Sequence, residues 1–213
     1  MGEIKPYKTI AKKSKTEIII NKSRFIGRAF PIETEDEAKE ILAQLRKQHY
    51  DATHNCYAYV ILNGAARYSD DGEPGGTAGL PMMEVLSSRS LSNVLCVVTR
   101  YFGGVLLGAG GLVRAYSKST AEAVAQAGEV LVTPGSIIKM EIAYDRYGAL
   151  EGYIRENTCS ATPEFLDKIY VTATVLSANT DKFTADIIEK SDGRVTPVLL
   201  GQEYIKVPID RAI

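Results

Sequence analysis

Residues 94–127 read VLCVVTRYFGGVLLGAGGLVRAYSKSTAEAVAQA and combine three local patterns. The β-branched and aromatic run from Val94 to Phe102 predicts a buried strand. A glycine-dense loop follows, and an alanine-rich helix is expected from Leu112 to Ala127, with Gly128 ending it. A strand, a glycine loop and a helix N-terminus in this order form a common anion-binding device.

The glycine-dense loop has two interpretations. Unpaired N–H groups and the helix dipole attract anions, and glycine lets a ligand approach the backbone. Tight packing or positive φ angles also require glycine, and the loop has neither the Walker pattern nor GxGxxG in its usual place. The candidate residues for anion or nucleic-acid binding are Arg100, Gly103, Gly104, Gly108, Gly110, Gly111, Arg114 and Lys118.

A second glycine-rich loop, Ser69–Met83, precedes the predicted strand. It holds three carboxylates within four residues, a set able to bind Mg²⁺ or to supply a base. Asp-Gly and Pro-Gly pairs equally favour a rigid turn. Two such loops in one small domain favour a ligand or partner surface. The candidate residues of this second loop are Asp70, Asp71, Gly72, Glu73, Gly75, Gly76 and Thr77.

One strand, His54–Leu62, places His54 and Cys56 on the same face by its period of two. A metal half-site or a Cys–His nucleophile pair are possible interpretations, but the sequence has no zinc spacing nearby. A hydrogen-bonded structural histidine is the expected role. We predict no catalytic constellation, no metal site and no cofactor.

The composition indicates an ordinary globular protein, with 45% hydrophobic and 24% charged residues. No apolar run reaches the ~18 residues of a membrane span, and the N-terminal stretch is not apolar enough for a signal peptide. The three cysteines are scattered, which argues against a disulfide scaffold or a zinc ribbon. We therefore expect a cytoplasmic protein with no membrane partner, and the oligomeric state is left open.

The remaining patterns predict an α+β protein of two domains, residues 1–134 and 135–213. In the first, two strands flank a turn at Asn21–Lys22, and a helix over Thr34–Gln48 begins with a capping box. The second reads βαββαβ, the order of a ferredoxin-like α/β plait. Its two helices are expected to be capped by Asp145 and Asn179.

Four motifs make the sequence recognisable: KSRFIGRA from 22, THNCYAYVI from 53, DDGEPGGTAG from 70 and VVTRYFGGVLLGAGGLVRAY from 97. Together they resemble the IMPACT family in its bacterial, YigZ-like form. The resemblance implies an N-terminal domain with the fold of domain 2 of the fifth small-subunit ribosomal protein. It also implies a C-terminal domain similar to domain V, the last plait of elongation factor G. Eukaryotic relatives modulate translation through a separate domain, so that activity is not carried over to this chain.

Three functions remain open at this point. The first is a binding module in which the glycine-loop face contacts RNA, on the ribosome, in a translation-related regulatory role. The second is a Mg-dependent enzyme acting on a nucleotide or a phosphorylated small molecule. The third is a protein–protein adaptor whose plait engages a translation factor. We favour the first, because nucleic-acid or ribosome binding is what the fold resemblance implies for bacterial members.

Overall fold

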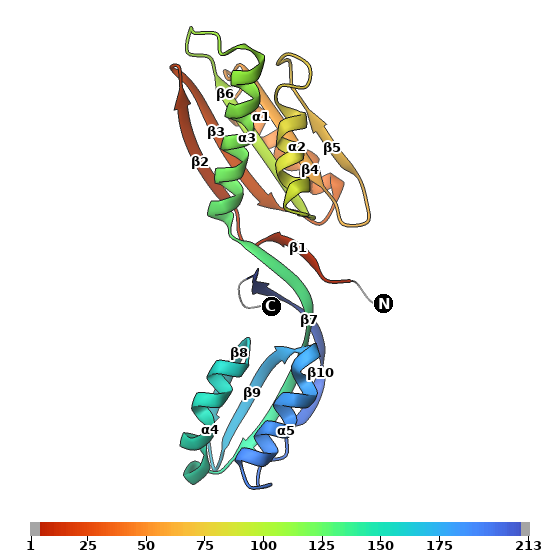
Figure 1. Ribbon diagram of the computed structural model, residues 1–213, viewed down its shortest axis with the longest axis vertical. Helices are drawn as coiled ribbons and strands as arrows, with labels where there is room; N and C mark the ends of the chain where they lie inside the picture. The colour runs from red at the N-terminus through yellow and green to blue at the C-terminus, as the bar shows by residue number, and fades with distance from the viewer. Residues whose placement is uncertain (1–4, 210–213) are drawn as a thin grey trace. The chain divides into compact units, whose positions relative to one another are not determined.

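The computed structural model describes residues 5–209 and divides into two compact units. One unit consists mainly of residues 7–131 and the other mainly of residues 132–207, and Figure 1 traces both along the chain. The division falls inside a single strand, β7 (Glu129–Ile142), rather than in a loop.

The N-terminal unit is built on a five-stranded antiparallel sheet in the order β2-β3-β6-β4-β5. Asn21 and Lys22 have positive φ angles of 47° and 64° and form the predicted two-residue turn between β2 and β3. The predicted central strand is confirmed as β6, whereas the short strand β5 was not predicted. The strands are β2 (Ser14–Ile20), β3 (Ser23–Pro31), β4 (His54–Val60), β5 (Ala66–Ser69) and β6 (Val94–Tyr101).

Helices cover both faces of this sheet because the central strand is apolar on both sides. Cys96 and Val98 of β6 lie in the core beneath α2 (Gly79–Ser88) and α3 (Gly108–Ala127). The alternate residues Leu95 and Val97 pack beneath α1 (Glu35–Gln48), which Figure 1 shows behind the sheet. A strand buried on both faces reads as a continuous hydrophobic run, which explains the pattern in the sequence.

The two best-marked helix starts have different outcomes. At α1, the Thr34 side chain accepts a hydrogen bond from the backbone N–H of Glu37 at 3.2 Å, as predicted. Helix α3, in contrast, begins at Gly108 and not at Leu112. The last three glycines of the predicted loop are therefore residues of the first helical turn.

The C-terminal unit has the predicted βαββαβ order, and its strands lie in the spatial order β10-β7-β9-β8 of a ferredoxin-like plait. The short strand β1 (Tyr7–Ile10), which belongs to the N-terminal unit, pairs with β7, the strand inside which the division falls. Asp145 does not cap α4, because this helix begins at Tyr144 and its N-cap residue is Ala143. Asn179 is the N-cap residue of α5, as predicted, but its side chain makes no capping hydrogen bond. The elements are α4 (Tyr144–Asn157), β8 (Ser160–Phe165), β9 (Ile169–Leu176), α5 (Thr180–Lys190) and β10 (Val198–Pro208).

Within the part of the chain that the structure describes, no helix is both long and apolar enough to cross a membrane.

Candidate functional site

A cleft of about 380 Å³ lies at the end of the N-terminal sheet where β6 ends and β4 begins. Arg100 and His54 are cross-strand partners there, so their side chains leave the same face of the sheet. The loop before α2 and the first turn of α3 complete the walls. The lining residues are Thr53, His54, Gly72, Glu73, Pro74, Arg100, Phe102, Leu106, Leu107, Gly108, Ala109 and Leu112.

A buried ion pair forms the polar end of the cleft. Arg100 is only 5% exposed and donates from Nη1 to Glu73 Oε1 at 2.6 Å. The hydroxyl of Tyr116 donates to the same carboxylate oxygen at 2.7 Å, and Arg100 Nη2 donates to Ser23 Oγ at 3.3 Å. The charge of Arg100 is therefore compensated inside the protein, so its role at the site differs from that of an exposed phosphate-binding arginine.

The Arg100 guanidinium also lies between two aromatic rings. Its central carbon is 5.4 Å from the Phe25 centroid and 5.5 Å from the Phe102 centroid, within cation–π range. Phe25 is buried, whereas Phe102 keeps 47% of its surface exposed. Arg100 Nε is a buried donor for which the described residues supply no acceptor. An unsatisfied buried donor beside a cleft is a group that a ligand acceptor can satisfy.

His54 has the hydrogen-bonded role that the sequence predicted, and it also reaches the cleft. Its Nδ1–H donates to the backbone oxygen of Asp71 at 2.8 Å. Nε2 is then left facing Glu73 Oε2 at 3.8 Å. Cys56 Sγ donates to the backbone oxygen of Asp70, and burial raises the pKa of this thiol to about 12. Cys56 is thus a protonated core residue, which removes the Cys–His nucleophile interpretation.

Asp70 holds the second glycine-rich loop closed. Its carboxylate accepts backbone N–H bonds from Gly76 at 2.9 Å, Ala78 at 3.0 Å and Gly79 at 2.8 Å. The side chain thereby takes up N–H groups at the start of α2 that the helix itself leaves unpaired. Burial opposes its charge, but these three bonds outweigh that effect and lower the pKa of Asp70.

The other two carboxylates of this loop have different partners. Asp71 Oδ1 accepts from Arg46 at 3.0 Å and Oδ2 from the Asn55 backbone at 2.7 Å, whereas Glu73 holds Arg100. Among residues 5–209, no group of three or more His, Cys, Asp or Glu side chains is arranged to hold a metal ion. The alternative interpretation in which Asp70, Asp71 and Glu73 bind one Mg²⁺ ion is not supported, since each carboxylate is held by a separate internal partner.

Some glycines of the two loops are required by the backbone. A Cβ on Gly103 would lie 2.0 Å from the carbonyl carbon of Lys22, and the Gly103 N–H donates to Ser23 Oγ. Gly76, Gly104 and Gly108 have positive φ angles of 77°, 81° and 68°. Gly72 is also left-handed, Gly75 borders open space, and Thr77 donates its hydroxyl to the backbone of the same loop.

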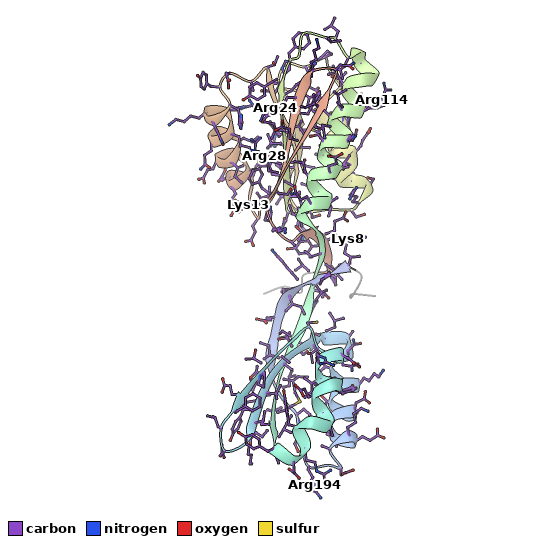
Figure 2. All side chains as sticks on the ribbon, turned by 90° about the vertical axis from the view of Figure 1, so that its left-hand side faces the viewer. Lys8, Lys13, Arg24, Arg28, Arg114 and Arg194 are labelled. Atoms are coloured by element: carbon purple, nitrogen blue, oxygen red, sulfur yellow. The ribbon has the colours of Figure 1, made fainter. Side chains whose placement is uncertain are left out.

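The first turn of α3 presents its N–H groups without a capping side chain. Leu107 is the N-cap residue, and no acidic residue lies in the first turn. Gly108 and Ala109 border the cleft directly. Arg114 is exposed, and its Nη1 lies 3.6 Å from the position of a Cβ on Gly110, so its guanidinium folds back over this turn (Figure 2). Arg114 and Gly110 are therefore neighbours in space.

The other predicted cation, Lys118, lies one turn further along α3 and is exposed. Its Nζ is 3.9 Å from the Glu122 carboxylate, so its charge is partly satisfied. Sequence reasoning missed Leu106, which is 85% exposed, and placed Phe102 at the end of a buried strand, although 47% of its surface is exposed. The available sequence signal was the presence of large apolar residues in the short segment between a strand and a glycine turn, where an exposed apolar surface can form.

An α+β fold of two units with an apolar cleft at the end of one sheet defines the general class of this protein. The family model for the "Impact N-terminal domain" matches residues 21–124, which include both walls of the cleft. IMPACT family member YvyE of Bacillus subtilis is 46% identical over 71% of this chain and 70% of its own length. An IMPACT family member of Haemophilus influenzae is 31% identical over 85% of this chain and 90% of its own.

A solved structure described as a hypothetical protein superposes with a TM-score of 0.59 at 27% identity, covering 93% of this chain and 99% of its own. This chain belongs to the IMPACT family. The match to Protein IMPACT homolog of Dictyostelium discoideum, 43% identical, covers 41% of this chain and only 26% of that protein. The similarity to the eukaryotic proteins is therefore confined to a part of each.

Proposed function

We propose that the N-terminal unit binds RNA through its α3 face, by which we mean Phe102, Leu106, the first turn of α3 over 108–111, and Arg114. The observation that carries this proposal is the uncapped first turn of a 20-residue helix beside Arg100, whose Nε is buried without an acceptor. Both features call for an acceptor from outside the chain, and both border the same cleft.

The phosphate groups of RNA match the charged part of this face. A helix N-terminus with unpaired N–H groups binds phosphate through those groups and through the helix dipole. Arg114 adds an exposed guanidinium over the same turn, and Lys118 extends the positive charge along the helix. Gly108 and Gly110 have no side chain to hinder an approaching phosphate.

The apolar part of the face suits an unstacked base. The exposed ring of Phe102 offers a stacking surface, already backed by the Arg100 guanidinium. The cleft behind it holds about 380 Å³, and its titratable side chains are those of His54, Glu73 and Arg100. Single-stranded RNA offers both a backbone and splayed bases, which this combination of groups recognises.

A ribosome-associated, translation-related regulatory role is our specific form of this proposal, and it follows the family resemblance. Co-sedimentation with bacterial ribosomes and with separated subunits, at low and moderate salt, tests it. The wild type is expected to sediment with ribosomal particles and to be released by salt, because phosphate contacts release counterions. Arg114→Gln and Phe102→Ala are expected to weaken sedimentation several-fold each.

Lys47→Gln is the matched control, because Lys47 is an exposed cation on α1, at the opposite face of the sheet. Sedimentation that persists in both α3-face variants would place the contact elsewhere and contradict the proposal. Salt-insensitive binding lost only in Phe102→Ala would instead identify an apolar protein surface and support the adaptor hypothesis. No sedimentation under any condition would exclude the ribosome.

A further inference from the structure

A second cleft, of about 460 Å³, lies on the opposite face of the same sheet, between α1 and the strands β2 and β3. Three of its lining residues are cations and none is a carboxylate. Figure 2 shows Arg28 and Lys13 beside α1, on the side of the sheet away from Arg114. The lining residues are Lys13, Ser14, Lys15, Arg28, Phe30, Ile41, Gln44, Leu45 and Gln48.

Arg28 is the buried member of this cleft, with 5% of its surface exposed. Its Nη1 donates to Thr99 Oγ1 at 3.1 Å, and its Nη2 donates to His49 Nε2 at 2.6 Å. An imidazole that accepts at Nε2 is neutral, and its Nδ1–H donates to the Tyr101 hydroxyl at 2.8 Å. Burial, and next the charge of Arg28, lower the pKa of His49, which favours its neutral form. Both partners of this buried cation are therefore uncharged.

No carboxylate pairs directly with Arg28. Asp51 accepts a hydrogen bond from the Tyr101 hydroxyl at 3.2 Å, so it reaches Arg28 only through Tyr101 and His49. Glu17 lies on β2 but is held by Arg24 through two hydrogen bonds of 2.7 and 2.9 Å. Lys15 is the direct cross-strand partner of Arg28, and like charges facing each other on neighbouring strands are destabilising. Within residues 5–209, no carboxylate forms an ion pair with Arg28, and none contributes to its electrostatic environment.

A buried cation without an anion is costly for a protein to maintain. Two hydrogen bonds use only two of the five donors of the Arg28 guanidinium, so the group retains capacity for a further acceptor. We infer that the cleft between α1 and β2–β3 binds the phosphate group of a small phosphorylated molecule. The phosphate completes the charge balance that Arg28, Lys13 and Lys15 leave open.

The remaining lining residues indicate an organic phosphate in preference to the inorganic ion. Gln44 and Gln48 lie one turn apart on α1 and offer amide groups at the same wall. Phe30, Ile41 and Leu45 add apolar surface beside the cations. Phosphate alone leaves that surface in contact with water, whereas a phosphomonoester with an apolar group covers it.

Isothermal titration calorimetry of the full chain at constant ionic strength tests the inference with two probes, inorganic phosphate and phenyl phosphate. We expect one site per chain, with phenyl phosphate binding at least several-fold more tightly than phosphate. Arg28→Met is expected to abolish binding of both probes. Lys15→Gln changes an exposed side chain and preserves folding, and it is expected to weaken binding about three- to ten-fold, as for the loss of one charged contact.

Lys47→Gln removes a charge from α1 outside the cleft and is expected to bind both probes as the wild type does. Absence of binding of either probe by the folded wild type would overturn the inference. Equal binding by the wild type and the Lys15→Gln variant would overturn it as well, even if Arg28→Met failed to fold. Equal affinities for the two probes would reduce the site to one for the inorganic ion and contradict the organic ligand.

Discussion

Arg28 and Arg100 are the two buried arginines of the N-terminal sheet, each 5% exposed, and they leave it on opposite faces. Arg100 faces a carboxylate that is itself almost fully buried, and a tyrosine hydroxyl supports the same oxygen. Arg28 faces a neutral imidazole and a threonine hydroxyl. The same residue type therefore makes a closed internal pair on one face and an open cationic site on the other.

The difference shows that the role of a buried arginine depends on whether a carboxylate pairs with it. A guanidinium with an internal carboxylate is part of the scaffold, and it orients neighbouring groups such as Phe102 and Glu73. A guanidinium without an internal carboxylate has donors free to bind an anion from outside the protein. The loss of either arginine removes the same charge, but the expected consequences for stability and binding differ.

The largest effect is expected from breaking the closed pair by Glu73→Gln. The substitution leaves Arg100 buried without its anion and should lower the free energy of unfolding by roughly 3 kcal/mol. Urea denaturation followed by circular dichroism measures it, with Glu17→Gln as the matched control in an exposed pair. A loss no larger than that of the control would show that the Arg100–Glu73 pair does not stabilise the fold.

A smaller effect is expected from the loop that carries Glu73. Asp70→Asn removes the charge that binds three backbone N–H groups and should cost roughly 2 kcal/mol at neutral pH. Because the folded-state pKa of Asp70 is lowered, this contribution is complete above the ordinary carboxyl pKa of about 4 and is lost as the pH falls through the folded value. The gap between the two proteins in urea denaturation should therefore close in acid. A gap independent of pH would contradict the assigned hydrogen bonds.

The smallest stability effect is expected from Arg28→Met. Replacing a buried, unpaired charge by an apolar side chain of similar length removes a desolvation penalty, and we expect a change within about 1 kcal/mol in the absence of ligand. Thermal unfolding with and without phenyl phosphate checks both halves of the account, since only the wild type should be stabilised by the ligand. A loss comparable to that of Glu73→Gln would show that Arg28 is compensated internally.

The sequence was sufficient for most of the fold because the deciding patterns are local. The run from Val94 predicted the central strand, and the spacing of apolar residues predicted α1 and the plait. The start of α3 was placed too late because three glycines within residues 108–111 are typical of a loop. In the structure these glycines form the first turn of the helix, at the mouth of the cleft. Strand β5, with only four residues, carries too weak a pattern to be recognised.

The residue types of the candidate site could be predicted from the sequence, but which side chains contact one another could not. Arg100, Glu73 and His54 were each noted, yet Arg100 lies 27 residues from Glu73 in the sequence. Arg100 is brought beside His54 only by the register of β4 against β6. The three neighbouring carboxylates suggested one metal site, whereas the folded loop directs each to a different donor. The role of Arg28 was invisible, because the absence of a partner is a property of the packed structure alone.

The most direct test of the central claim, that the α3 face and not the α1 face binds RNA, is a salt titration of binding to a fluorescently labelled single-stranded RNA, followed by anisotropy. Wild type, Arg114→Gln on the α3 face and Lys15→Gln in the α1 cleft are compared. We expect the wild type to bind with a steep salt dependence, and Arg114→Gln to reduce the slope of log K against log salt by about 1. Lys15→Gln should leave that slope unchanged. A slope reduced by Lys15→Gln but not by Arg114→Gln would place the RNA on the opposite face and contradict the account.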